Sequence, residues 1–516
     1  MTEEAQAEAD KGLAEFLDTL PSEVREERPL MDFQKEGIRF GLARRGRCLL
    51  GDEMGLGKTL QALAVIAHYV NEWPALVIAP SALRLVWRDQ ALTWLPHLLN
   101  KDSVQVLLHG KQTVNENARL VIVSYDLLTR NQRFQSRADG EMYKVVIVDE
   151  AHFIKDPAAK RSKAVQKLCQ TAARCVLISG TPTLNKAAEL HVQLAALLPS
   201  RLVPSFSKFC GRYCERQESF YGGARVVKWV GAKRKPELNA LLTQTVMIRR
   251  LKQDVLTQLP SKRRQRITLD SSKLDAAKMR EIDDALKRGT LLTYDDEVDG
   301  FEAAPQVTGL FKLTAEAKVG GVKEYVEYLL GNDLKFLVFG HHHLLLDGIE
   351  QKLVECGVKY IRIDGHTPVL NRAEAVEQFQ SREDVRVAVL SITACGQGLT
   401  LTAAHTVVFA ELYWVPGQLL QAEDRCHRIG QEHCVDVHYC IAEGSLDERV
   451  FLSLNKKRKD TTGILDGKES TMDAWKQTAA SASVLKRPRD TESATADVAP
   501  PRGIAKFLFR QQNTEE

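Results

Sequence analysis

The chain has 516 residues, of which 44% are hydrophobic and 27% are charged, proportions typical of a folded, water-soluble protein. This length excludes a single small domain and predicts about three folding units. Seventy-one Lys and Arg residues against 67 Asp and Glu residues leave a net charge of only +4. Any nucleic-acid binding must therefore use local basic patches rather than the charge of the whole chain.

The ten cysteines lack a framework of short spacings, which indicates reduced thiols rather than a disulfide scaffold. Cys210 and Cys214 are the most closely spaced, and no second pair follows at a distance suited to zinc. The acidic N-terminus lacks the apolar segment of a secretory signal, and no uncharged apolar run approaches the roughly 18 residues needed to span a bilayer. We therefore expect no membrane association.

Short apolar runs alternate with helical patterns in two separate stretches, which predicts an α/β protein with two doubly wound parallel-sheet lobes. The strand-like runs of the first stretch are Cys48 to Asp52, Ala75 to Pro80, Leu120 to Tyr125, Val145 to Glu150 and Cys175 to Gly180. Those of the second stretch start near Lys335, Tyr360, Val387, Thr406 and Val437.

Between the two stretches the pattern is irregular and rich in charge, as in MIRRLKQDV and SKRRQR. After about residue 470 the chain turns to Ser, Thr, Ala and Pro, a composition that favours disorder. The expected organisation is an N-terminal extension (1–28), a first lobe (29–199), a helical insertion and hinge (200–310), a second lobe (311–470) and a disordered tail (471–516).

A glycine-rich segment, LLGDEMGLGKTLQA, lies between the first strand-like run and an amphipathic helical pattern. Backbone N–H groups there, together with the helix N-terminus, can hold phosphate oxygens. Lys58 would pair with the β and γ phosphates of a nucleotide, and Thr59 would bind Mg²⁺. The complete phosphate-loop pattern has glycine where this chain has Asp52, so the motif alone is an incomplete match.

Asp149 and Glu150 end the β-rich run that starts at Val145, at the edge where α/β sheets place their ligands. Asp149 would hold Mg²⁺, and Glu150 would polarise the attacking water. A strand that ends in a solvated acidic turn would give the same pattern. The correct order of the two motifs on matching elements favours hydrolysis of Mg-ATP over that alternative.

Arg425 and Arg428 lie three residues apart in QAEDRCHRIGQ, whose helical pattern predicts both side chains on one face of a helix. Arginines from a second lobe can stabilise charge on the γ phosphate when the lobes close on ATP. An exposed, salt-bridged helix is the alternative interpretation of this pair.

The segments DEMGLGKT, VSYDLL, VDEAHFIKD, LISGTP, VLSITACGQGLTLTAA and QAEDRCHRIGQ follow one another in this chain. Their order resembles that of the Swi/Snf-type DEAH-box ATPases of helicase superfamily two, over about residues 28 to 465. In that family the position of Asp52 is commonly not glycine. LMDFQKEGI, RLVWRDQALTWLP, TAEAK and RIDGHT look most like the annealing-helicase branch, the HARP-bearing SMARCA-like proteins and their zinc-finger relatives.

The resemblance implies two RecA-like lobes that use ATP and Mg²⁺, with a role for each matching residue. Gln34 should recognise the adenine base, and His152 should link the acidic pair to the SGTP segment. The implied nucleotide-binding residues are Gln34, Asp52, Gly55, Gly57, Lys58, Thr59, Gly398 and Gln421. The implied catalytic residues are Lys58, Asp149, Glu150, Arg425 and Arg428, with Thr59 and Asp149 as the Mg²⁺ ligands.

Six further residues lie in family segments that track a DNA strand, where hydroxyl and backbone N–H groups suit contacts to phosphate. They are Ser81, Ser124, Tyr125, Gly180, Thr367 and Thr393. For each hydroxyl the alternative is a helix cap, which is the commoner role at the end of a strand.

The tail carries short motifs that suggest partners and location. Lys486 to Asp490 (KRPRD) is typical of a nuclear import signal, and Lys456 to Lys459 is a second candidate whose alternative is a solvated last helix. Lys506 to Arg510 (KFLFR) resembles the motif by which some relatives bind the sliding clamp PCNA, although Phe509 replaces the usual small aliphatic residue. About 28 residues precede the first lobe, so we expect no HARP module there.

The predicted function is an ATP-dependent DNA translocase and annealing helicase of the nucleus, acting on branched or forked DNA in repair of replication forks. Composition and spacing alone reach only a two-lobe Mg-ATP hydrolase, and the rest is implied by the resemblance. The alternatives are a nucleosome-remodelling ATPase and, from another class, a non-catalytic adaptor docked on the clamp. The sequence leaves the oligomeric state open, and a monomer is the default expectation.

Overall fold

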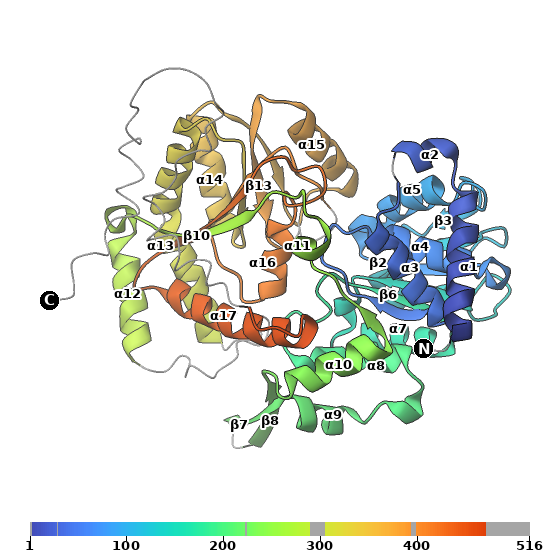
Figure 1. Ribbon diagram of the computed structural model, residues 1–516. Coiled ribbons are helices and arrows are strands. Elements are labelled where there is room, and N and C mark those ends of the chain that lie inside the picture. Colours follow the sequence, from blue (N-terminus) through green and yellow to red (C-terminus); the bar gives the residue numbers. More distant parts are fainter. Residues whose placement is uncertain (1–2, 28, 222–223, 289–304, 394–398, 471–516) are drawn as a thin grey trace. The chain divides into compact units, whose positions relative to one another are not determined.

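The computed structural model describes residues 3–27, 29–221, 224–288, 305–393 and 399–470. The described chain forms two compact units, the first running to Leu259 and including Lys459–Glu469, the second running from Pro260 to Arg458. Each unit is built on a parallel sheet with helices packed against it (Figure 1), which confirms the predicted fold class. Within these ranges no helix is both long enough and apolar enough to cross a bilayer.

The first unit contains a seven-stranded, all-parallel sheet in the order β3-β4-β2-β5-β6-β1-β9. Five strands coincide with the predicted runs, and β3 and β9 were missed because they are only three and two residues long. The strands are β1 (Arg47–Leu50), β2 (Ala75–Ala79), β3 (Val104–Val106), β4 (Leu120–Ser124), β5 (Val145–Asp149), β6 (Arg174–Ile178) and β9 (Met247–Ile248).

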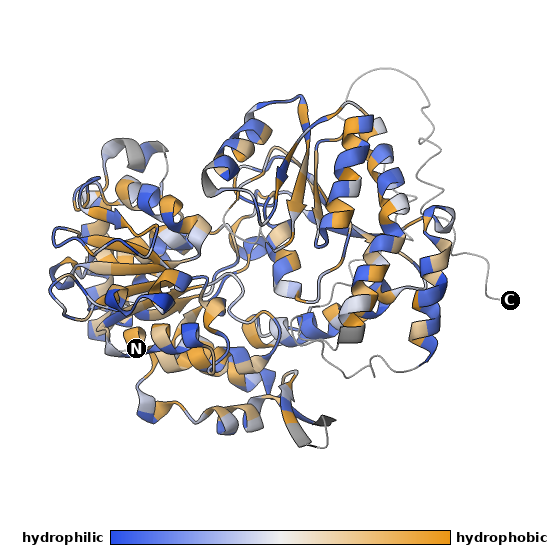
Figure 2. Ribbon diagram, turned by 180° about the vertical axis from the view of Figure 1, so that it is seen from behind, coloured by the Kyte–Doolittle hydropathy of each residue, from blue (hydrophilic) through white to orange (hydrophobic). Residues whose placement is uncertain are grey.

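Helices cover both faces of this sheet because its strands are apolar on both sides, as expected for parallel strands. Alternate residues of β1 point to opposite faces: Leu49 packs into one buried cluster, whereas Cys48 and Leu50 pack into the other. Figure 2 shows the resulting apolar interior and the polar outward faces of the helices. The helices are α1 (Glu3–Thr19), α2 (Ser22–Glu27), α3 (Asp32–Ala43), α4 (Lys58–Ala67), α5 (Arg84–Trp94), α6 (Tyr125–Arg130), α7 (Lys160–Thr171) and α8 (Leu190–Leu197).

The N-terminal extension is part of the first unit's core. Ala9, Leu13 and Phe16 of α1 are buried in the cluster formed by α3, α4 and α5. These residues recur at helical spacing, so one face of α1 is covered while its charged residues stay exposed.

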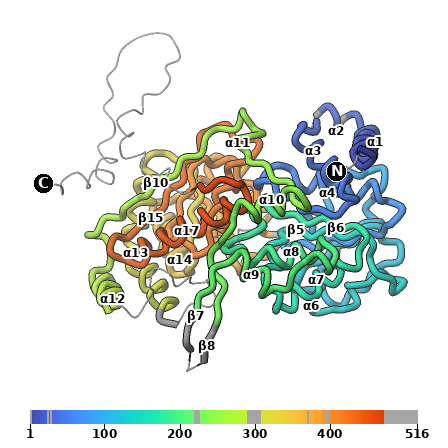
Figure 3. The backbone as a smooth tube through the Cα atoms, turned by 60° about the horizontal axis from the view of Figure 1, so that its bottom comes forward, coloured from blue at the N-terminus to red at the C-terminus, as the bar shows by residue number. Residues whose placement is uncertain are grey.

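Residues 200–259 of the predicted insertion also belong to the first unit. The chain passes through α9 (Phe206–Tyr213), an antiparallel hairpin of β7 (Glu215–Tyr221) and β8 (Ala224–Val230), α10 (Lys235–Thr245) and α11 (Lys252–Val255). Figure 3 labels α9, β7, β8, α10 and α11 along this green segment. Leu238 and Leu242 of α10 enter the core. The sequence analysis expected a helical insertion here, and the segment contains the β7–β8 hairpin in addition to its helices.

The second unit contains a six-stranded, all-parallel sheet in the order β10-β15-β14-β11-β13-β12. Its strands are β10 (Lys262–Thr268), β11 (Phe336–Gly340), β12 (Lys359–Ile363), β13 (Val385–Ser391), β14 (Thr406–Phe409) and β15 (Val435–Ile441). Its helices are α12 (Ala276–Lys287), α13 (Pro305–Gly331), α14 (His343–Glu355), α15 (Val369–Ser381), α16 (Pro416–Glu423) and α17 (Leu446–Leu465), of which α17 ends in the first unit.

The basic SKRRQR segment, which the sequence analysis placed in the hinge, forms most of β10. It forms a strand despite its charge because carboxylates of the second unit neutralise it: Arg263 pairs with Asp436 and Arg264 with Glu423. The chain thus passes from one unit to the other within the predicted hinge, between Leu259 and Pro260.

The second import candidate, Lys456 to Lys459, lies on α17, as its structural alternative proposed. Its Lys457 is buried, and the ammonium donates to the carbonyl of Trp414. The tail motifs from Lys486 to Asp490 and from Lys506 to Arg510 lie outside the described residues.

Candidate functional site

The phosphate loop connects β1 to α4 at the carboxyl end of the sheet. Gly55 and Gly57 adopt φ angles of +85° and +73°, a region that disfavours side chains. A Cβ atom at Gly57 would also lie 2.4 Å from Nε2 of Gln34. The loop therefore needs glycine here to turn its backbone into the first turn of α4, where N–H groups can receive an anion.

Lys58 is the first residue of α4, and its ammonium lies inside the loop. Nζ donates to the carbonyl oxygens of Asp52 and Glu53 at 2.8 and 3.0 Å. Burial lowers the pKa of Lys58 to about 8, although the nearby carboxylates of Asp52, Glu150 and Asp149 oppose that shift. The cation is thus held among acceptors, where a phosphate can take their place.

The predicted acidic pair lies at the end of β5, two strands from β1 in the sheet. Glu150 has a φ of +52°, which turns the chain sharply after the strand. Burial, and then the neighbouring carboxylate of Glu150, raise the pKa of Asp149 to about 7. A divalent cation would favour the charged form of Asp149, because cation binding requires the deprotonated carboxylate.

His152 makes the contact that the resemblance implied. Its Nδ1 atom lies 3.1 Å from the hydroxyl of Ser179, in the SGTP segment after β6, and 3.2 Å from Oε2 of Glu150. The imidazole is buried, so it joins the acidic pair to the end of the neighbouring strand.

The donor set fits Mg²⁺ and a nucleoside triphosphate. The proposed cation ligands are the hydroxyl of Thr59 and the carboxylate of Asp149, hard oxygen donors of the kind that Mg²⁺ prefers. The positive φ angles of Gly55 and Gly57 turn the loop backbone towards the first turn of α4, where N–H groups can receive phosphate oxygens. Which of these groups touch the nucleotide stays a prediction.

Gln34 lies against the phosphate loop from α3. Its side chain accepts a hydrogen bond from the amide of Met31 at 3.0 Å, and Nε2 donates to the carbonyl of Leu56 at 3.5 Å. The Gln34 side chain is buried, and its hydrogen bond to Leu56 stabilises the phosphate loop.

The carboxylate of Asp52 faces a cation that the sequence analysis did not assign. Arg250, which follows β9, donates to Oδ1 and Oδ2 at 2.9 and 2.5 Å and also contacts the carbonyl of Phe33. Gln61 of α4 donates to Oδ2 at 3.1 Å. This network ties the loop to α3, α4 and β9, and the signal for it was the charge-rich segment MIRRLKQDV.

The nucleic-acid candidates of the first unit follow the ends of β2, β4 and β6. Ser81 is exposed. The hydroxyl of Ser124 caps α6 by accepting from Leu127, and the hydroxyl of Tyr125 donates to the carbonyl of Asp149 at 2.5 Å. Gly180 is buried against Met54. For Ser124 the structure thus shows the cap that the sequence analysis gave as the alternative, and nucleic-acid contact at all four positions stays a prediction.

In the second unit, Thr367 and Thr393 follow β12 and β13. Oγ1 of Thr367 donates to Asp364 at 3.3 Å, and Oγ1 of Thr393 lies 3.2 Å from the hydroxyl of Ser391. Thr393 is exposed. Their contact with DNA also stays a prediction.

The expectation that Arg425 and Arg428 share a helix face was wrong. α16 ends at Glu423, and both arginines lie in the turns that follow. At the end of the helix, Lys262 of β10 forms ion pairs with both Glu423 and Asp424. These ion pairs fix the end of α16 beside β10. Gln421 is buried on the last turn of α16.

Local contacts position the two arginines. Arg425 is fully buried, and its Nη1 donates to the carbonyl of Leu399 at 3.4 Å. Arg428 donates to the carbonyl of Asp424 at 2.7 Å and to the hydroxyl of Thr400 at 3.2 Å. Gly398, the other candidate of this unit, lies outside the described residues.

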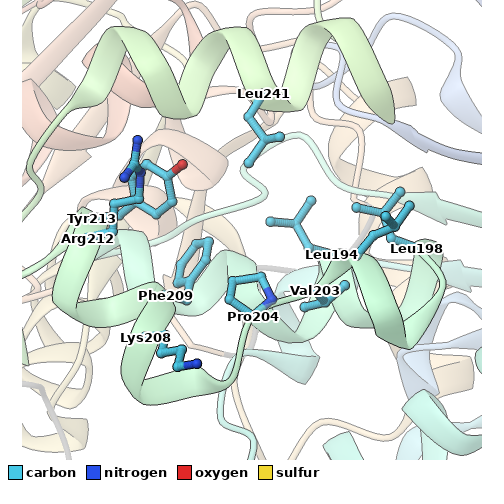
Figure 4. A pocket seen from close by; sticks show the side chains of 10 residues that line it. Leu194, Leu198, Val203, Pro204, Lys208, Phe209, Arg212, Tyr213 and Leu241 are labelled. Atoms are coloured by element: carbon cyan, nitrogen blue, oxygen red, sulfur yellow. The ribbon is translucent and has the colours of Figure 1, made fainter.

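A separate pocket of about 250 Å³ lies in the first unit, between α8, α9 and α10. Its lining is mostly apolar, with Lys208 and Arg212 contributing the charged groups (Figure 4). None of the lining residues belongs to the phosphate loop or the acidic pair, so this pocket is not the nucleotide site.

The fold and site together define a protein of two parallel-sheet α/β units, with a phosphate loop and a DEAH segment on one of the two sheets. A family model described as the SNF2-related domain matches residues 33–311, and one described as the helicase conserved C-terminal domain matches residues 321–430. The chain belongs to the SNF2-related family.

Curated relatives are similar over most of this chain. The mouse (Mus musculus) protein "DNA annealing helicase and endonuclease ZRANB3" is 42% identical over 89% of this chain and 42% of its own length. The Xenopus laevis "SWI/SNF-related matrix-associated actin-dependent regulator of chromatin subfamily A-like protein 1" is 42% identical over 83% of this chain and 43% of its own length. The chain thus spans less than half the length of these relatives.

Among solved structures, the "Sulfolobus solfataricus SWI2/SNF2 ATPase core in complex with dsDNA" is 24% identical, with a TM-score of 0.39. It covers 85% of this chain and 93% of its own.

Proposed function

We propose that this protein is a DNA-dependent ATPase that translocates on DNA and anneals separated strands at branched or forked junctions. The observation that carries the proposal is the convergence of the Lys58 loop, the Asp149–Glu150 pair and the His152–Ser179 contact at one end of one sheet. The names of the relatives supply the substrate, because similar chains are described as DNA annealing helicases.

In this proposal each residue acts through the group that the structure presents. Backbone N–H groups of the loop and the ammonium of Lys58 bind the phosphates, and the carboxylate of Glu150 accepts a proton from the attacking water. His152 contacts both Glu150 and Ser179, and so it fixes the position of Glu150 relative to the SGTP segment. Mg²⁺, held by Thr59 and Asp149, would neutralise charge on the phosphates. Arg425 and Arg428 are assigned to the charge that develops on the γ phosphate.

The test is steady-state ATP hydrolysis with single-stranded, duplex, forked and nucleosomal DNA at one fixed salt concentration, because phosphate contacts weaken steeply with salt. Glu150→Gln is the blank, and Lys58→Ala and Arg428→Ala test the two sets of cationic residues. We expect the strongest stimulation with forked DNA and loss of hydrolysis in all three variants. Strongest stimulation by nucleosomes would instead indicate a nucleosome-remodelling ATPase. Normal ATP hydrolysis in Lys58→Ala would contradict the proposed mechanism.

We further propose that the protein acts in the nucleus as a monomer and binds the sliding clamp PCNA through Lys506 to Arg510. The support is the sequence of the tail, including Lys486 to Asp490 as the import signal. Binding of purified PCNA to the full chain and to a chain truncated after residue 470 tests the motif. Equal binding by both would contradict it.

A further inference from the structure

The indole of Trp87 contacts the carboxylate that the proposed function assigns to Mg²⁺. Trp87 lies on α5 and is buried. Its Nε1–H donates to Oδ2 of Asp149 at 2.8 Å, across a separation of 62 residues. The other carboxylate oxygen, Oδ1, accepts from the amide of Glu150 at 2.9 Å. Each oxygen of Asp149 thus has one fixed donor, which holds the plane of the carboxylate in one orientation.

The contact is specific to this tryptophan. Trp94, about two turns further along α5, donates to Gln90 on its own helix, and Trp73 donates to the carbonyl of Ile66. Those two indoles satisfy their N–H groups with residues four and seven positions away in the chain. Only a residue with a long, rigid ring and a donor at its far edge can reach from α5 to the end of β5 in this way.

The same helix begins at the segment that carries Ser81. The short helix Ser81–Leu83 leads directly into α5, and Arg84 fixes the junction by donating to the carbonyls of Ser81 at 3.0 Å and of Leu107 at 2.5 Å. Ser81 is exposed and is a predicted contact to a DNA phosphate. Because Trp87 lies on the helix that directly follows the Ser81–Leu83 segment, a shift of this segment would move α5 and the indole with it.

We propose that Trp87 is a positioning residue for Asp149, and that it transmits the binding of DNA at the Ser81–Leu83 segment to the Mg²⁺ carboxylate. The first part rests on the geometry of the indole and the carboxylate. The second part rests on the proposed function, because it requires DNA at Ser81. Asp149 itself is the residue that contacts the cation, and Trp87 acts through it.

The experiment compares the full-length protein with Trp87→Phe and with Trp94→Phe, a matched control on the same helix. Mn²⁺ replaces Mg²⁺ as the probe, and its binding to the ADP complex is measured from the electron paramagnetic resonance signal of free Mn²⁺, with and without duplex DNA. Loss of an outer contact to a metal ligand weakens binding by about tenfold or more. We expect that loss in Trp87→Phe and wild-type affinity in Trp94→Phe. Unchanged Mn²⁺ affinity in Trp87→Phe would overturn the positioning role.

A second measurement uses the wild-type protein, so its result does not depend on whether a variant folds. The chain has six tryptophans, so its indole N–H resonances can be resolved by nuclear magnetic resonance after labelling tryptophan with ¹⁵N. We expect the Trp87 resonance to shift when Mg-ADP binds and to shift again when duplex DNA is added, with the Trp94 resonance unmoved. A Trp87 resonance indifferent to DNA, in a protein whose ATP hydrolysis DNA does stimulate, would overturn the transmitting role and leave the proposed function standing. Absence of that stimulation would instead contradict the proposed function, while the Mn²⁺ comparison would still decide the positioning role.

Discussion

The guanidinium of Arg264 on β10 and the carboxylate of Glu423 at the end of α16 form a buried ion pair, with 2.6 Å between Nη2 and Oε2. The phenol of Tyr439 also donates to Glu423. These bonds hold the pKa of Glu423 well below its usual range despite burial. Because Arg425 lies two residues after Glu423, this ion pair fixes the segment that carries Arg425 and Arg428.

We predict that Arg264→Met destabilises the second unit by about 3 kcal/mol, the lower end of the range for breaking a buried pair, since Lys262 still contacts Glu423. ATP hydrolysis should fall with it. Arg263→Met is the matched control on the adjacent, outward-facing position, because Arg263 is 41% exposed and pairs with Asp436. Urea unfolding of both variants checks the prediction, and equal losses would contradict it.

Gly37 on α3 is packed so closely against Gln61 and Arg250 that a side chain at this position would collide with them. A Cβ atom there would lie 1.8 Å from Oε1 of Gln61 and 2.7 Å from Nη2 of Arg250. Gly37→Ala must therefore displace part of the network around Asp52, and we predict a loss of about 2 kcal/mol. Gly211 on α9 has open space around its Cβ position, so Gly211→Ala should gain about 0.5 kcal/mol. Urea midpoints that move in the same direction would contradict this pair of predictions.

His438 on β15 makes the stability depend on pH. Burial lowers the pKa of His438 to about 4, and its Nδ1 lies 2.9 Å from the hydroxyl of Tyr325. Asp436 opposes that shift and Arg263 adds to it. The folded protein keeps this imidazole neutral, whereas the unfolded chain binds a proton below about pH 6.5. The contribution of His438 is therefore complete above that pH and is lost as the pH falls from about 6.5 towards 4.

We predict that His438→Gln loses less stability than the wild-type protein between pH 7 and pH 5. The difference should be about 2 kcal/mol, from about 1.4 kcal/mol per pH unit over the part of the window below pH 6.5. The measurement is the free energy of unfolding in urea at the two pH values. A variant with the same pH dependence as the wild-type protein would rule out His438 as the titrating group.

The sequence predicted what depends on residues close together in the chain. Ten of the thirteen strands in the two sheets and the Lys58 loop follow from short patterns, and Asp149 and Glu150 follow from their position after an apolar run. The contacts of Trp87 with Asp149, Arg250 with Asp52 and Arg264 with Glu423 join residues 62, 198 and 159 positions apart. A single charged or aromatic residue gives no indication of such a partner. The sequence therefore singled out the segments RLVWRDQ and SKRRQR but did not predict which residues they contact.

The end of α16 shows the same limit. The spacing of Arg425 and Arg428 fits one face of a helix. The side chains of Glu423 and Asp424 instead bind cations of β10, a tertiary effect that no local pattern encodes.

The final prediction concerns Arg249, which joins the phosphate loop to the last described residues of the chain. Its Nη1 donates to the carbonyls of Gly51 and Gly180 at 2.7 and 3.0 Å, and its Nε donates to Oδ1 of Asp466 at 2.5 Å. Arg249 and Asp466 are both nearly buried. The carboxylate thus orients the guanidinium that holds two strand ends of the nucleotide site.

Asp466→Asn keeps the volume of the side chain and removes its charge. We predict a loss of about 2 kcal/mol, the range for hydrogen bonds to charged groups, and weaker binding of a fluorescent ATP analogue. Glu469→Gln is the matched control three residues further on, because Glu469 is exposed and its partner Lys235 keeps a second carboxylate, Asp460. The control should bind the analogue with wild-type affinity. Stability lost in Asp466→Asn without any change in nucleotide affinity would show that Arg249 supports the fold and not the site.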